Sequence, residues 1–206
     1  MNQARVSVVK VGGSLLATAG FPQRLRTWLG NRMDAHRDTH FVILAGGGKW
    51  VDAIRELHAR SPLEDERAHW ICVDIMDVTA GLLGAMLPEL GAIENYAELN
   101  RRVREPGVTL LKPSEFVARI EPTRAGTRLP ADWSVTGDSI AARLAIVLGA
   151  DELVLVKSVP PPIVRENDDQ LDALAAAGYV DRFLPTLRDE LPPIQFSPLP
   201  IPEDIS

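Results

Sequence analysis

The stretch Val6-Ser7-Val8-Val9-Lys10-Val11-Gly12-Gly13-Ser14-Leu15 runs from an apolar segment into two glycines and carries one lysine near the end of that segment. A continuous apolar run of this length predicts a strand that is buried on both faces of a sheet. Gly12 and Gly13 lack a Cβ atom, so backbone N–H groups can come close to a bound anion there. Lys10, the two glycines and Ser14 therefore predict a phosphate-binding turn. In the alternative interpretation, Lys10 only extends its ammonium group into solvent and the glycines only turn the chain.

A second apolar run, residues 40–45, also ends in glycines, here Gly46, Gly47 and Gly48. Residues 50–59 follow with apolar side chains at helical spacing, so the glycines open a helix. Free N–H groups gather at such a helix start, at the positive end of the helix dipole, and favour an anion. We expect this turn to contact a ligand as well. Neither turn has the glycine spacing of a dinucleotide-binding motif or of a Walker loop.

The third informative stretch is residues 133–142, in which Thr136 is a predicted N-cap and Asp138 falls in the first helical turn. The helix is expected to end at Gly149, and a buried strand, residues 152–156, follows and leads into Lys157. Ligands bind at the carboxyl edge of parallel sheets, so Asp138 and Lys157 are expected to gather there with Lys10. A simpler interpretation also exists for Asp138, because a carboxylate in a first turn stabilises a helix by about 0.3–1 kcal/mol.

Composition predicts a single domain over residues 1–206. The chain is 46% hydrophobic and 24% charged, as in ordinary soluble globular proteins. A net charge of -6 argues against a nucleic-acid surface. The single cysteine, Cys72, excludes an intrachain disulfide and is interpreted as a packing residue of a protein in a reducing compartment. With no signal-peptide pattern and no apolar run of about 18 residues, we expect a cytoplasmic protein without a membrane partner.

Residues 68–87 predict a long helix that is apolar on most sides and ends at Pro88. Such a helix is either internal core or a subunit contact, and we expect a homo-oligomer. Asp74 and Asp77 lie on it and need partners if they are buried. After residue 191 the chain is rich in proline, and we expect this tail to pack as an extended arm.

Three of these motifs together resemble the amino acid kinase superfamily, whose members act on glutamate, aspartate, uridylate and isopentenyl phosphate. They are Lys10-Val11-Gly12-Gly13-Ser14-Leu15, the Gly46-Gly47-Gly48 turn, and Thr136-Gly137-Asp138 before a helix of small residues. Their order and spacing extend over most of the chain. Within the superfamily, residues 68–70, 129–139 and 155–159 are most similar to the aminomethylfuranmethyl-phosphate kinases of methanofuran biosynthesis and their bacterial relatives.

The resemblance implies an α/β fold, a three-layer αβα sandwich around a mainly parallel sheet. It also implies transfer of the γ-phosphoryl group of ATP to a small acidic acceptor, a carboxylate or a phosphate. The preferred acceptor is a phosphate monoester such as an aminomethylfuran phosphate, in the synthesis of a one-carbon carrier cofactor. Mg²⁺ would bridge the phosphates, and no side chain is assigned as a metal ligand.

The same resemblance implies roles for the motif residues. Lys10 would bind the transferring phosphoryl group, and Asp138 would orient its ammonium by a charge-assisted hydrogen bond. The nucleotide phosphates would be held by Gly12, Gly13, Ser14 and Thr136, and the acceptor by Gly46, Gly47 and Gly48.

Two family features are missing from this chain. Many members have Asp-Gly after the strand that ends near Lys157, whereas this chain has Ser158-Val159-Pro160-Pro161-Pro162-Ile163. The Gly-Gly-Met-x-x-Lys motif, source of a second phosphate-binding lysine, is replaced by residues 177–181, and Lys157 is predicted to substitute for that lysine. These departures leave open a second hypothesis, a catalytically degenerate regulatory or scaffold subunit that binds a nucleotide or an oxyanion.

Overall fold

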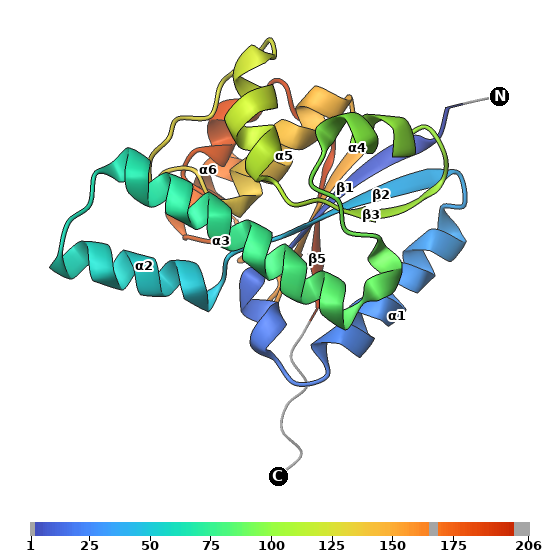
Figure 1. Cartoon of the computed structure of the whole chain (residues 1–206), viewed down its shortest axis with the longest axis horizontal. Helices are drawn as coiled ribbons and strands as arrows, with labels where there is room; N and C mark the ends of the chain where they lie inside the picture. Colours follow the sequence, from blue (N-terminus) through green and yellow to red (C-terminus); the bar gives the residue numbers. More distant parts are fainter. Residues whose placement is uncertain (1–2, 165–168, 200–206) are drawn as a thin grey trace.

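The computed structural model describes residues 3–164 and 169–199, whose five strands form one sheet in the order β3-β2-β1-β4-β5 (Figure 1). Every strand pair is parallel, which confirms the predicted α/β class and makes the sheet parallel throughout. The strands are β1 (Arg5–Val11), β2 (Thr39–Ala45), β3 (Gly107–Leu110), β4 (Glu152–Lys157) and β5 (Ile194–Pro198). The helices are α1 (Phe21–Ala35), α2 (Lys49–Arg60), α3 (Asp65–Met86), α4 (Tyr96–Arg102), α5 (Gly137–Leu148) and α6 (Gln170–Ala176).

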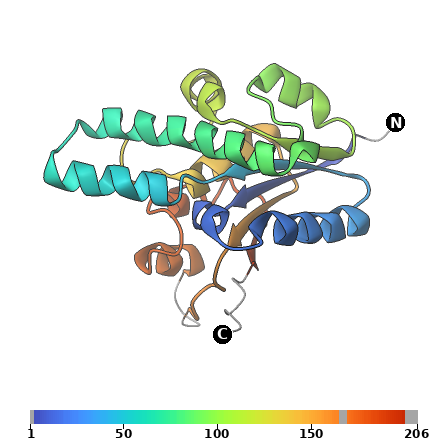
Figure 2. The same cartoon turned by 60° about the horizontal axis from the view of Figure 1, so that its bottom comes forward.

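The sheet has an apolar core on each face. Val6 and Val8 of β1 belong to the core that α4 and α5 cover, and Val9 and Val11 belong to the core that α1 covers. Figure 2 shows α1 below the sheet and α4 above it. Because both faces are covered, the strands are apolar at consecutive positions rather than at alternate ones. The three-layer arrangement expected from the sequence is confirmed.

Helix α3 is the one helix of the described ranges that is long and apolar enough to cross a membrane by length and composition. It is a helix of the protein core, and its buried residues are Ala68, His69, Val73, Met76, Thr79, Ala80 and Leu83. Asp77 on this helix has a partner, because its carboxylate accepts hydrogen bonds from the backbone N–H and the hydroxyl of Ser114, at 3.1 and 2.5 Å. Burial nevertheless raises the pKa of Asp77.

Four further segments complete the fold. The proline-rich tail packs in an extended conformation, as expected: its residues Ile194–Pro198 form β5, which extends the sheet beside β4, and residues 200–206 lie outside the described residues. Ile93 makes a single bridge with Leu111, and Phe116–Ile120 form a π-helical turn. The polar segment 121–129 is anchored in the interior, since the carboxylate of Glu121 lies 3.0 Å from the fully buried guanidinium of Arg143. That ion pair crosses from one segment to another, so the local polarity of the segment did not indicate burial.

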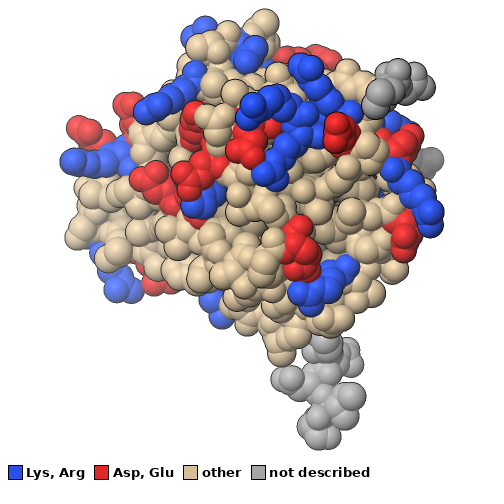
Figure 3. Space-filling view, turned by 45° about the vertical axis from the view of Figure 1, so that its right-hand side comes forward, with Lys and Arg blue, Asp and Glu red and all other residues tan. Residues whose placement is uncertain are grey.

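The outer surface carries charges of both signs. On the face shown in Figure 3, Lys and Arg side chains alternate with Asp and Glu side chains instead of gathering into a basic patch. The net charge of -6 is therefore not concentrated on that face in one acidic field.

Candidate active site

A cavity of about 760 Å³ opens at the carboxyl ends of β1, β2 and β4. Both glycine turns, the first turn of α5 and the side chains of Lys10 and Lys157 line it. Further walls come from α2, α3 and the segments around Trp133 and Tyr179. All ten residues that the sequence suggested as a site therefore border one cavity: Lys10, Gly12, Gly13, Ser14, Gly46, Gly47, Gly48, Thr136, Asp138 and Lys157.

The two glycine turns interlock. A Cβ atom on Gly13 would lie 2.2 Å from the amide nitrogen of Gly48 and 2.3 Å from the carbonyl oxygen of Gly46. Gly48 itself has a φ of 55°, which side-chain-bearing residues rarely adopt. Only glycines allow the backbones to approach this closely, so the turns form one continuous backbone surface.

Hydrogen bonds divide this surface into structural and available N–H groups. The N–H of Gly12 donates to the carbonyl of Val156 on β4 at 2.9 Å, and the N–H of Gly46 donates to the carbonyl of Val11 at 2.9 Å. These two glycines hold their turns onto the sheet. Within the described residues, no protein acceptor is recorded for the N–H groups of Gly13 and Gly48.

Lys10, Asp138 and Lys157 form an ion triplet in which Lys10 and Asp138 are buried and Lys157 is half-buried. The Lys10 ammonium lies 2.8 Å from Oδ1 of Asp138, and the Lys157 ammonium lies 2.6 Å from Oδ2 of the same carboxylate. The lysines come from adjacent parallel strands, and register pairs Lys10 with Leu155, two residues before Lys157. Asp138 comes from the first turn of α5, where Gly137 passes so close that a Cβ atom there would lie 2.9 Å from Cε of Lys10.

The charges in this triplet shift one another's pKa values. Burial alone would lower the pKa of Lys10, but the Asp138 carboxylate outweighs burial and raises it. Burial alone would raise the pKa of Asp138, but the two ammonium groups lower it. Lys157 shifts the other way: burial and repulsion by Lys10 lower its pKa despite the same carboxylate. Lys157 is therefore the first of the two lysines to lose its proton as the pH rises.

Asp181 is a site residue that sequence reasoning missed. Its Oδ2 accepts hydrogen bonds from the backbone N–H groups of Thr136 and Ser139, at 3.0 and 2.7 Å, and its Oδ1 accepts one from the hydroxyl of Thr136. Thr136 is the N-cap residue of α5, as predicted, but its hydroxyl bonds to Asp181 and makes no cap hydrogen bond of its own. The only sequence signal was that residues 177–181 replace the missing lysine motif.

Aromatic side chains also line the cavity. The Trp133 and His58 rings meet edge to face with centroids 5.1 Å apart, and the Arg55 guanidinium lies 5.8 Å from the centroid of the Trp133 ring. His69 is buried, and burial lowers its pKa, so its imidazole is neutral. Its Nδ1 lies 3.3 Å from the carbonyl of Asp132, which makes Nδ1 the donor and leaves a lone pair on Nε2.

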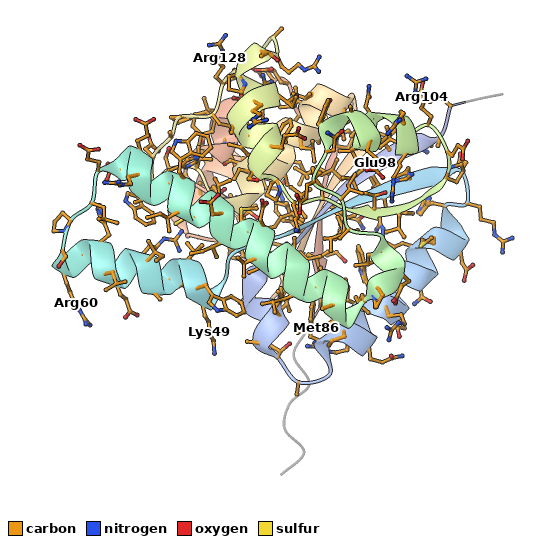
Figure 4. The ribbon with its side chains drawn as sticks, viewed as in Figure 1. Lys49, Arg60, Met86, Glu98, Arg104 and Arg128 are labelled. Carbon is orange, nitrogen blue, oxygen red and sulfur yellow. The ribbon has the colours of Figure 1, made fainter. Side chains whose placement is uncertain are left out.

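Two other residues bear on the candidate site. Cys72 borders the cavity and is half-buried, so it is not only a packing residue; burial raises the pKa of its thiol. Lys49, which follows the second glycine turn, is exposed and points from α2 into solvent (Figure 4).

The comparisons with known proteins agree with this geometry. Residues 5–169 match the model of the amino acid kinase family. Two curated relatives are the [5-(aminomethyl)furan-3-yl]methyl phosphate kinase of Methanocaldococcus jannaschii, 24% identical over 155 residues, and the acetylglutamate kinase of Nitrosococcus oceani, 28% identical over 108 residues. The matches cover 74% and 48% of this chain but only 65% and 34% of those two relatives.

Solved structures with the same fold include the uridylate kinase of Archaeoglobus fulgidus, with a TM-score of 0.63, 16% identity, and coverage of 94% of this chain and 90% of that one. Aspartate kinase from Synechocystis has a TM-score of 0.60 and 20% identity, and covers 95% of this chain and 38% of that one. At these identities the structures show the fold alone. Because the family model spans most of the chain, this protein belongs to the amino acid kinase family.

Proposed function

We propose that this protein transfers the γ-phosphoryl group of ATP to a small acidic acceptor, and that the acceptor is a phosphate monoester such as an aminomethylfuran phosphate. One observation carries the proposal: two ammonium groups, of the buried Lys10 and the half-buried Lys157, are held on the two oxygens of Asp138 beside the interlocked glycine turns. The name of the Methanocaldococcus jannaschii relative supports the choice of acceptor.

The chemistry needs positioning and charge stabilisation more than it needs a base. An oxygen of the acceptor anion attacks the γ-phosphorus, the bond from that phosphorus to the β–γ bridging oxygen breaks, and ADP leaves with the bonding electron pair. An acceptor that is already an anion loses no proton. Lys10 and Lys157 would stabilise the charge on the transferring group, and Asp138 would hold both ammonium groups in place.

The residues that line the cavity fit the phosphates of a nucleoside triphosphate such as ATP. The free N–H groups of Gly13 and Gly48 and the two ammonium groups offer donors to phosphate oxygens, at a surface that any Cβ atom would block. Across residues 3–164 and 169–199, no group of three His, Cys, Asp or Glu side chains is placed to hold a metal ion. Mg²⁺ would then be held mainly by the phosphates it accompanies, where it neutralises their charge.

The aromatic wall fits the acceptor. Trp133 and His58 line the cavity with rings against which a flat, unsaturated group can pack, and the Arg55 guanidinium lies over the Trp133 ring. The lone pair on Nε2 of His69 could accept a hydrogen bond from an amine or hydroxyl of the acceptor. An aromatic phosphate monoester matches this wall better than a short aliphatic carboxylate.

The decisive experiment is an acceptor screen. Purified protein is incubated with Mg-ATP and a panel of phosphate and carboxylate acceptors, including an aminomethylfuran phosphate, and ADP release is measured. Turnover with a phosphate monoester supports the proposal, and Lys10→Ala should then reduce kcat on the order of 100-fold. ADP release at background level with every acceptor, the furan phosphate included, contradicts it.

One observation favours the second candidate, a degenerate regulatory or scaffold subunit. Where many family members carry Asp-Gly after this strand, Pro160-Pro161-Pro162 is flanked by exposed apolar residues, Val159 and Ile163, which are 56% and 102% exposed. An altered base pocket could bind a nucleotide without turnover. Stabilisation by ATP or ADP without ADP release would favour this candidate, and no stabilisation by either nucleotide would contradict both.

We also propose a homo-oligomer in the cytoplasm. The surface of α3 carries a stripe of exposed apolar residues at a spacing of four, Val78, Leu82 and Met86, which are 60%, 39% and 40% exposed. A second copy of the chain is the proposed partner, because an apolar stripe of this kind is a common subunit contact. The single cysteine agrees with a reducing compartment.

A further inference from the structure

The carboxylate of Asp181 joins the C-terminal part of the chain to the start of α5. Asp181 lies between α6 and the turn Leu184–Leu187, yet it accepts two backbone hydrogen bonds and one hydroxyl hydrogen bond from Thr136 and Ser139. These donors flank Asp138 on both sides. A shift of Asp181 would therefore move the helical turn that carries the carboxylate shared by the two lysines.

The same C-terminal segment holds Lys157. The Lys157 ammonium donates to the carbonyl of Tyr179 at 2.8 Å and to Asp138 at 2.6 Å, and it lies 5.2 Å from the centroid of the Tyr179 ring. An ammonium group has three N–H donors, so these two bonds leave one donor for the cavity. Tyr179 and Asp181 are two residues apart, so one short segment fixes both Lys157 and the helix start.

Asp181 also balances the charge of the site. Lys10 and Lys157 bring two positive charges, and Asp138 supplies only one negative charge. Asp181 is a second carboxylate near them, and its charge raises the pKa of both ammonium groups. Burial and the Asp138 carboxylate raise the pKa of Asp181 itself, while Lys10 and the hydrogen bonds from Thr136 and Ser139 act in the opposite direction and favour its charged form. Tyr179, the other titratable group at this position, remains a neutral phenol because burial and Asp138 raise its pKa.

We propose that Asp181 is a positioning residue of the phosphoryl-transfer site: by binding Thr136 and Ser139 it fixes the turn that carries Asp138, and it provides the second negative charge beside Lys10 and Lys157. This inference rests on the proposed function. It assigns to the segment Tyr179-Val180-Asp181 part of the role that the missing lysine motif has in other family members.

Two variants separate the hydrogen bonds from the charge. In Asp181→Asn, the amide oxygen can accept both backbone bonds and the amide nitrogen can donate to the Thr136 hydroxyl, so the contacts remain and only the charge is lost. We expect kcat about 10-fold lower and the alkaline limb of the kcat/KM profile at lower pH. In Asp181→Ala the hydrogen bonds and the charge are both lost. We expect kcat to fall on the order of 100-fold below the wild type, because small misplacements of reacting groups slow the reaction strongly.

Asp169→Ala is the matched control. The Asp169 carboxylate also accepts two backbone hydrogen bonds at a helix start, from Leu171 and Asp172, but none from the site residues. It should lower the melting temperature, as Asp181→Ala does, without changing kcat. Equal kcat values in the two alanine variants, with an unshifted alkaline limb in Asp181→Asn, would overturn the inference.

A second measurement does not depend on turnover. Acetic anhydride acylates neutral amines, so mass spectrometry can follow acylation of Lys157 from pH 7 to pH 10. We expect Lys157 to react faster in Asp181→Asn than in the wild type, and Asp169→Ala to match the wild type. If the wild type shows no turnover with any acceptor, the proposed function fails, and the acylation rates alone decide the inference. Equal rates in Asp181→Asn and the wild type then overturn it.

Discussion

The Lys157 ammonium lies 2.6 Å from the Asp138 carboxylate, on the oxygen that Lys10 does not contact. One carboxylate thereby holds two ammonium groups from two strands. If either lysine is removed, the other is the only lysine that contacts Asp138. The pair is largely withdrawn from solvent, with side-chain exposures of 14% for Lys157 and 4% for Asp138. Where so little solvent screens the charges, the two ammonium groups attract a phosphate more strongly than they would in water.

Replacing Lys157 with Met should lower kcat on the order of 100-fold, because a charged donor to the transferring group is lost while the apolar stem is kept. Steady-state ADP release with the acceptor identified by the screen measures the effect. Lys49→Met is the control, since Lys49 is exposed and points away from the cavity. A Lys157 variant as active as the Lys49 variant would remove Lys157 from the site.

Activity should fall on the alkaline side at a pH below the usual lysine range. Burial and the charge of Lys10 lower the pKa of Lys157, so its charged form is lost first as the pH rises, while Asp138 raises the pKa of Lys10. The pH profile of kcat/KM reports groups of the free enzyme and is the measurement to make. The alkaline fall in kcat/KM should be absent from the Lys157→Met variant. An unchanged limb in that variant would assign it to another group.

Gly13→Ala should disrupt both glycine turns. The added Cβ atom would lie 2.2 Å from the amide nitrogen of Gly48, and backbone cannot move aside as a flexible side chain can. We expect a loss of about 1–3 kcal/mol in the free energy of unfolding, together with loss of stabilisation by ATP. Gly30→Ala in α1 is the control, because nothing lies within 4 Å of a Cβ atom there. That variant should gain about 0.5–1 kcal/mol and keep ATP binding.

Trp133→Leu should weaken acceptor binding while leaving the nucleotide unaffected. If the acceptor ring packs on Trp133, its KM should rise about 10-fold, which corresponds to about 1.4 kcal/mol, and the KM for ATP should stay constant. Trp50→Leu is the control, since Trp50 is an exposed residue of α2 that does not border the cavity. An equal rise in both KM values would place Trp133 in general stability rather than acceptor recognition.

Val78→Glu should dissociate the proposed homo-oligomer, because a charge would be buried in an apolar subunit contact. Light scattering after size-exclusion chromatography gives the mass of each variant. Ile163→Glu changes a more fully exposed apolar residue in the loop after β4 and should leave the mass unchanged. A wild-type protein that is monomeric at micromolar concentration would contradict the proposed contact.

Much of the fold was predictable because its signals are local. The apolar runs of β1, β2 and β4 indicate strands covered on both faces, and Gly149 ends α5 in the left-handed conformation that glycine adopts readily. The tail was harder to predict. Its prolines suggested an extended arm but did not indicate its pairing with β4. In the structure β5 is an edge strand, where a missing N–H on one side is tolerated.

The sequence by itself determined the two glycine turns, the strands that end in Lys10 and Lys157, and Asp138 at a helix start, because each depends on neighbours within a few residues. Only the tertiary structure decided that Asp138 contacts both lysines and that Asp181, not the side chain of Thr136, caps α5. These contacts depend on β4 pairing with β1 and on the return of the C-terminal segment to α5. Burial, which makes such charge pairs necessary, is a property of the packed chain and not of any short stretch of it.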